Sequence, residues 1–136
     1  MRIAIPRPTP NSATARCHCG GVEMVAAFPS RFCAHCYCFS CRSTHAAGVV
    51  TWIGFKREQV RITKGAELVR DYLSSPGTRR KFCTNCGTRL AFESEHNDWG
   101  GEMHLPLALF VTAVDRVPTA NSFAEERPEW APFHPL

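Results

Sequence analysis

The chain has 136 residues, 44% of them hydrophobic, and a formal net charge of +4. This length fits one domain with a sizeable buried core. No apolar run reaches the roughly 18 residues of a membrane-spanning helix, so no membrane span is expected. The first residues lack the apolar stretch of a secretory signal, which favours the cytoplasm, where thiols stay reduced.

Residues 1–16 contain Pro6, Pro8 and Pro10 among polar residues, and we expect them to form a flexible or extended lead-in. The domain is expected over residues 17–136. Within it, short β-branched and aromatic stretches alternate with glycine and proline, which is typical of strands joined by turns. The predicted strands cover residues 22–28, 49–55, 60–63, 67–73, 80–82, 89–92 and 105–114.

One short helix is predicted over residues 39–47. In the proline-containing tail from residue 118 onward, Phe123, Trp130 and Phe133 are expected to pack onto the body of the domain. The many short strands and the few helical stretches together predict a small, mainly β, single-domain fold with one or two short helices.

Eight cysteines fall into three tight groups. These groups are Cys17 and Cys19; Cys33, Cys36, Cys38 and Cys41; and Cys83 and Cys86. Cysteines one or two residues apart can direct their sulfurs toward one point about 2.3 Å away, as tetrahedral zinc requires. A disulfide framework is the alternative, but C-x-C pairs make poor disulfides and cytosolic chains rarely contain them. The spacing therefore predicts metal binding.

Bound zinc would change the net charge. Four thiolates with one Zn²⁺ contribute −2 and three thiolates with one Zn²⁺ contribute −1, so one site of each kind lowers +4 to about +1. Nucleic-acid binding thereby loses its electrostatic support.

Several motifs follow one another in a recognisable order. They are Cys17-x-Cys19-Gly20-Gly21, Cys36-x-Cys38-x-x-Cys41-Arg42, Trp52, Lys64-Gly65, residues 68–72, and Arg80-Lys81-Phe82-Cys83-x-x-Cys86-Gly87-Thr88. This succession, over residues 17–136, resembles the glutathione-dependent formaldehyde-activating enzyme family, whose domain also occurs in centromere protein V. The resemblance implies a small, mainly β fold that binds two zinc ions.

The resemblance also implies a division of the ligands. Cys17, Cys19, Cys83 and Cys86 (the first cluster) would hold a structural zinc. Cys36, Cys38 and Cys41 (the second cluster) would hold a catalytic zinc with an open coordination position. Sequence distance agrees with this division, because a zinc shared by the first cluster would join the two ends of the domain, whereas the second cluster spans one loop.

Cys33 leaves three alternatives open. It could be a fourth ligand that closes the second zinc site, it could stay outside an open three-cysteine site, or it could be a buried or redox-active thiol. Its C-x-x-C spacing to Cys36 permits closure, so spacing alone does not decide, and the resemblance favours the open site. A closed site would favour a non-catalytic zinc-stabilised module that binds a protein or nucleic acid.

The family reaction joins glutathione to formaldehyde, and its reverse is a carbon–sulfur lyase reaction. By resemblance, we expect an enzyme that joins glutathione or a similar small thiol to a small electrophile. Three positions depart from the family pattern. Tyr37 and Asn121 stand where the family usually or often has histidine, and Ser43 stands where it often has a second basic residue. These departures concern the substrate more than the metal.

Around the second cluster, Arg42 is the predicted substrate-binding cation, since glutathione carries two carboxylates. The run Arg79, Arg80 and Lys81 is expected to be solvent-exposed, and Trp52 to be a core residue rather than a pocket wall. Of the histidines, His18 is interpreted as a spacer, and His35 and His45 as neither ligands nor proton carriers. Oligomeric state has no signal in the sequence.

Overall fold

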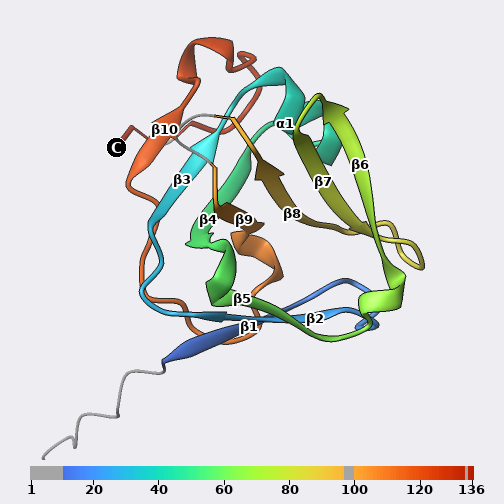
Figure 1. Cartoon of the computed structure of the whole chain (residues 1–136). Coiled ribbons are helices and arrows are strands. Elements are labelled where there is room, and N and C mark those ends of the chain that lie inside the picture. The colour runs from blue at the N-terminus through green and yellow to red at the C-terminus, as the bar shows by residue number, and fades with distance from the viewer. Residues whose placement is uncertain (1–10, 97–99, 134) are drawn as a thin grey trace, which may run out of the picture.

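The computed structural model describes residues 11–96, 100–133 and 135–136. In these residues ten strands form two sheets, one above the other, as Figure 1 shows. The small sheet has the order β1 (Ser12–Arg16), β2 (Glu23–Ala27) and β5 (Val60–Lys64). The large sheet has the order β10 (Ala120–Ser122), β3 (Phe32–Cys36), β4 (Val50–Lys56), β9 (Glu102–Pro106), β8 (Arg89–Ser94), β7 (Thr78–Cys83) and β6 (Val69–Ser75).

All these strand pairs are antiparallel except β10 with β3, which is parallel. The one α-helix of the described residues, α1 (Phe39–His45), follows β3 and is seven residues long. Short 3-10 turns occupy η1 (Arg57–Gln59), η2 (Ala66–Leu68), η4 (Leu107–Leu109) and η5 (Ala124–Glu126). No helix in the described ranges is both long enough and apolar enough to cross a membrane.

The mainly β prediction is confirmed, and three local expectations differ. Residues 12–16 of the expected lead-in form β1, which pairs along its whole length with β2, while residues 1–10 lie outside the described residues. The strand expected over 105–114 ends at Pro106 and continues as the 3-10 turn η4. Residues 32–36, interpreted only as part of a cysteine group, form β3, an inner strand of the large sheet.

The large sheet is buried on both faces around β4, and this separates the interior into two clusters. Ile53 and Phe55 point into the main core between the two sheets, whereas Val50 and Trp52 point to the opposite face. Because successive side chains of a strand alternate between faces, β4 contributes to both clusters. The second, smaller cluster contains Cys36 and Cys41.

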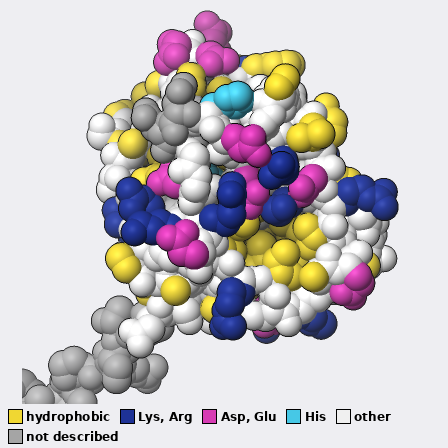
Figure 2. Space-filling view, viewed as in Figure 1, with side chains coloured by type: hydrophobic (Ala, Val, Ile, Leu, Met, Phe, Trp, Pro, Cys, Tyr) yellow, Lys and Arg dark blue, Asp and Glu magenta, His cyan; other side chains and the backbone are white. Residues whose placement is uncertain are grey.

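The C-terminal tail is held against α1 and β3. The Tyr37 hydroxyl donates to the Pro132 carbonyl at 3.0 Å, and the Tyr37 and Phe133 rings lie 5.9 Å apart. Trp130 is 73% exposed, although one edge of its ring lies beside Gly48, next to the buried Ala131. Figure 2 shows basic and acidic side chains intermingled on the face that it presents, without a large area of one sign.

Candidate metal centres

The four sulfurs of the first cluster lie within 4.8 Å of one another. Cys17 Sγ is 3.5 Å from Cys19 Sγ, which is 3.9 Å from Cys83 Sγ. Sulfurs arranged tetrahedrally about 2.3 Å from a zinc ion would be about 3.8 Å apart. The first cluster therefore has the ligand type, number and spacing of a closed zinc site.

Two tight turns bring these cysteines together. The Gly20 N–H donates to the Cys17 carbonyl at 3.0 Å, and the Gly87 N–H donates to the Cys83 carbonyl at 2.8 Å. Both glycines have positive φ, 74° and 79°, a conformation that other residues adopt only with strain. Cys17 follows β1 and Cys83 ends β7, so the first cluster joins the small sheet to the large sheet.

The sulfurs of the second cluster also lie within 4.8 Å of one another, and Cys36 Sγ is 3.4 Å from Cys38 Sγ. Cys36 ends β3, and Cys41 lies in the first turn of α1. Cys38 is the N-cap of α1, where its Sγ accepts a hydrogen bond from the Cys41 N–H at 3.4 Å. The start of the helix thus fixes the second cluster, whose three thiols suit a soft divalent metal.

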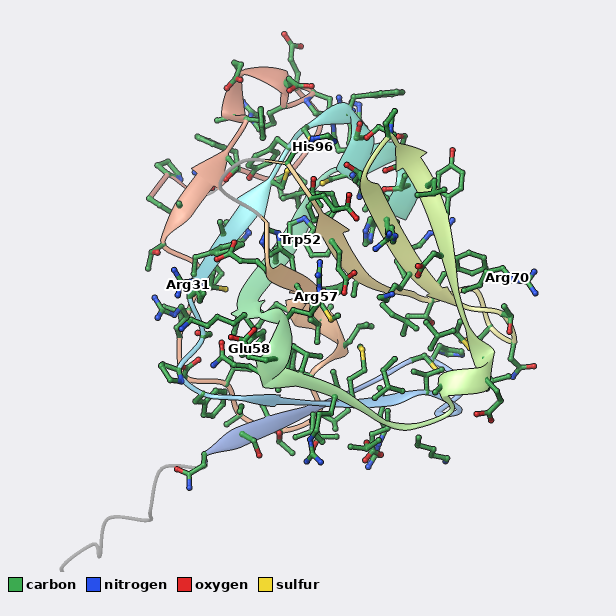
Figure 3. All side chains as sticks on the ribbon, viewed as in Figure 1. Arg31, Trp52, Arg57, Glu58, Arg70 and His96 are labelled. Atoms are coloured by element: carbon green, nitrogen blue, oxygen red, sulfur yellow. The ribbon has the colours of Figure 1, made fainter. Side chains whose placement is uncertain are left out.

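A cavity of about 110 Å³ opens onto the second cluster. Its remaining walls are mostly apolar and come from Phe32, Ala34, Trp52, Phe92, His104, Ser122 and Phe123. Figure 3 shows Trp52 inside the fold, in contrast to Arg70, which points outward from β6. Trp52 is 6% exposed, so it is both the core residue that was predicted and a wall of the cavity.

Cys33 lies outside the second cluster. It is buried in the main core between the sheets, three residues before Cys36 on the same strand. Positions i and i+3 of a strand face opposite sides, so Cys33 points away from the cluster that contains Cys36. Burial raises the pKa of the Cys33 thiol, as expected for an inert core cysteine. A closed four-sulfur second site, which the binding-module alternative required, is not formed by the described cysteines.

The Cys33→Ala variant is therefore expected to bind as many metal ions as the wild type. Loss of one buried sulfur should lower the free energy of unfolding by about 1–2 kcal/mol. Metal analysis together with chemical denaturation measures both quantities. Loss of one metal ion from this variant would show that Cys33 is a ligand.

Protonation of the second cluster predicts how metal affinity depends on pH. Hydrogen bonds from Cys36 and Cys41 lower the pKa of Cys38 to about 2, while hydrogen bonds with Cys38 and Cys41, then burial, raise the pKa of Cys36. The pKa of Cys41 is also raised. From these directions we expect that, without metal, Cys38 is the thiolate and the other two thiols keep their protons at neutral pH.

Metal binding must displace those protons, so the metal affinity of the second cluster is expected to rise with pH through the neutral range. Calorimetric titration with zinc in buffers of different ionisation enthalpy measures the proton release. An affinity that does not change between pH 6 and pH 8, with no protons released, would contradict this assignment.

Arg80 is the cation that the structure places at the second cluster, against the expectation that it is solvent-exposed. It is 5% exposed, and its Nη1 and Nη2 atoms each lie 3.9 Å from Cys41 Sγ. Arg42, the predicted substrate-binding residue, does not line the cavity. Its Nε donates to the Tyr37 carbonyl at 2.9 Å, and its guanidinium lies 5.6 Å from the centre of the Phe39 ring.

His104 is a wall of the cavity that carried no signal in the sequence. It is 6% exposed, and its Nε2 lies 3.2 Å from Glu102 Oε1. Burial lowers the pKa of His104, and the neighbouring Glu102 partly offsets this effect. His45 contacts Trp52 edge to face, and burial, followed by the charges of Arg80 and Arg89, lowers its pKa to about 4. Both histidines are therefore expected to be neutral at pH 7.

Comparison with solved structures shows a crystal structure of a Rhodobacter sphaeroides protein, a structural genomics target, with the same fold. It is 21% identical, has a TM-score of 0.63, and the match covers 80% of this chain and 99% of that one. No curated protein matches the chain. The family model described as glutathione-dependent formaldehyde-activating enzyme matches residues 12–126, which contain both cysteine clusters. The chain belongs to the glutathione-dependent formaldehyde-activating enzyme family.

Proposed function

We propose that this protein is a zinc-dependent enzyme that joins glutathione, or a similar thiol, to formaldehyde or another small aldehyde. The reverse reaction is a carbon–sulfur lyase reaction. Family membership supports the reaction class. The observation that carries the proposal is a cluster of three thiols, not four, that opens onto a cavity.

In this proposal the first cluster holds a structural zinc and the second cluster holds the catalytic one. Three protein ligands plus an open position are typical of catalytic zinc, whereas four cysteines are typical of structural zinc. When bound at the second cluster, zinc would supply a site that lowers the pKa of a thiol and polarises an aldehyde oxygen.

The cavity limits the size and polarity of the electrophile. An apolar protein cavity of about 150 Å³ accommodates benzene, so the 110 Å³ here suits an aldehyde of a few heavy atoms. Its walls include Phe32, Trp52, Phe92 and Phe123 but no lysine, arginine, aspartate or glutamate among the described residues. The charged ends of glutathione must then remain outside the cavity, with only its thiol directed inward.

His104 is the residue that we assign to proton transfer. Addition of a thiol to an aldehyde removes a proton from sulfur and adds one to oxygen, so a neutral base close to both atoms accelerates it. His104 lines the cavity, and Glu102 holds its Nε2 side and would stabilise the protonated ring.

The His104→Gln variant is expected to lower kcat about 100-fold, a typical contribution of a general acid–base group, and to bind two metal ions per chain. In this variant, kcat should no longer fall at low pH as a result of protonation of residue 104. His35→Gln is the matched control, because His35 contacts Thr51 and lies outside the cavity. An unchanged pH profile in His104→Gln would remove His104 from the mechanism.

The reaction itself is tested by two measurements on the purified protein. Metal analysis should give two zinc ions per chain. Exchange NMR should show faster interconversion of glutathione, formaldehyde and S-hydroxymethylglutathione than in buffer, and larger apolar aldehydes should be compared with formaldehyde. A protein with two zinc ions that accelerates none of these exchanges would overturn the proposed activity.

A further inference from the structure

Arg80 is held in place by four side chains. Besides the two contacts of 3.9 Å with Cys41 Sγ, its Nη1 donates to Thr44 Oγ1 at 3.1 Å and its Nε donates to Ser74 Oγ at 3.3 Å. The guanidinium also lies over the Phe92 ring, 5.0 Å from the ring centre. These contacts join β7, α1, β6 and β8 around one buried positive charge.

This charge has no carboxylate partner among the described residues. In the described part of the chain, no ion pair within 4.0 Å involves Arg80, whereas the neighbouring Arg79 and Lys81 both pair with Asp71. A buried charge is costly unless an opposite charge compensates it. The acceptors Thr44 and Ser74 are neutral. Among the described residues that Arg80 contacts, the thiol of Cys41, a member of the second cluster, is therefore the group that can become negatively charged.

A metal-loaded second cluster supplies that negative charge. Three thiolates with one divalent ion carry 3 × (−1) + 2 = −1, and Arg80 carries +1, so the sum is zero. Cys36 and Cys41 are 7% and 6% exposed, so solvent screens this site poorly. The first cluster is different, because Cys19 is exposed and backbone N–H groups of Gly21 and Val22 donate to its sulfurs.

We infer that Arg80 is the counter-cation of the second metal centre and sets its affinity for the metal. This inference rests on the metal binding of the second cluster in the proposed function. The two N–H groups directed at Cys41 stabilise its thiolate form and reduce the negative charge that this sulfur donates to the metal. Arg80 is a positioning residue in this scheme and does not contact substrate.

Titration of the metal-free protein with Co²⁺ tests the inference, because sulfur-to-cobalt absorption reports thiolate ligation without any turnover. The wild type should bind two ions. Arg80→Met should lower the affinity of one ion by about 10- to 100-fold and leave the other unchanged, as for other residues that support metal ligands. Arg80→Lys retains the positive charge, so its affinity for this ion should fall much less.

Arg79→Met is the matched control. Arg79 precedes Arg80 on β7, is partly exposed, and pairs with Asp71 and Glu95 on the other face of the strand. The Arg79→Met variant should bind both ions with the affinities of the wild type. Absorption of the first, four-sulfur centre serves as an internal measure of folding in every variant.

Each outcome has a distinct meaning. Wild-type protein that binds one ion would contradict the second metal centre and with it the proposed function. Wild-type protein that binds two ions, together with Arg80→Met of unchanged affinity, would overturn the role of Arg80 alone. If Arg80→Met does not fold, Arg80→Gln replaces it, and equal affinities in Arg80→Gln and Arg80→Lys would overturn the inference.

Discussion

Cys83→Ser is expected to lose one metal ion and, with it, the cooperative fold. The first cluster joins the end of β7 in the large sheet to the chain that follows β1 in the small sheet. Structural zinc sites contribute about 10–16 kcal/mol in small zinc-binding peptides, and a domain of this size has a net stability of only about 5–15 kcal/mol. Circular dichroism melts and metal analysis of the same samples measure the effect.

Cys33→Ala is the control for this variant, since Cys33 is equally buried but lies outside both clusters. The control should unfold in a single transition near the wild-type temperature. A Cys83→Ser protein with a wild-type melting temperature and a full complement of metal would show that the first cluster does not stabilise the fold.

Cys38→Ser is expected to have the opposite combination of effects, an inactive protein that stays folded. Loss of one of three ligands should remove the second metal ion and lower activity by more than about 100-fold, since even residues that only support a ligand contribute about 10- to 100-fold. Serine is a preferred N-cap and can accept the hydrogen bond from the Cys41 N–H, so α1 should be retained. The melting temperature should change by only a few degrees.

Ser40→Ala, an exposed position in the same turn, is the matched control and should keep both metal ions and full activity. Metal analysis, exchange NMR and thermal melts of both variants distinguish the loss of a metal ligand from a general effect of substitution in this turn. An active Cys38→Ser protein with two metal ions would exclude Cys38 as a ligand of a catalytic centre.

The sequence predicted the two clusters because the constraints on them are local. A C-x-C or C-x-x-C step places two sulfurs near one point whatever the rest of the chain does, and glycine after the pair permits the turn, as Gly20 and Gly87 do here. The resemblance to the family then implied which pairs belong together, and the structure brings those residues together.

Whether Cys33 is a ligand could not be predicted in the same way, because the direction of its side chain depends on secondary structure. Three residues separate Cys33 from Cys36, which suits a turn, but residues 32–36 form a strand in which these two side chains face opposite sides. Strand formation there depends on pairing with β4 and with β10, which begins only at Ala120.

The orientation of Arg80, unlike its burial, has a signal in the sequence. Three consecutive cations resemble a solvated surface, but residues 80–82 were predicted to be a strand, and alternation turns the middle cation of the run away from its two neighbours. The side of the sheet that is buried cannot be read from this local pattern, because burial there comes from α1 and β8.

Strand β7 carries both Arg80 and Cys83, three residues apart, and so belongs to both metal centres. In the proposed two-zinc scheme, an ion bound by the first cluster would fix the end of this strand and, with it, the position of Arg80 beside Cys41. Loading should therefore be hierarchical, with the structural ion entering first and the catalytic ion leaving first under a chelator. If both ions are zinc, as proposed, zinc shortage is expected to abolish the proposed activity before it unfolds the protein.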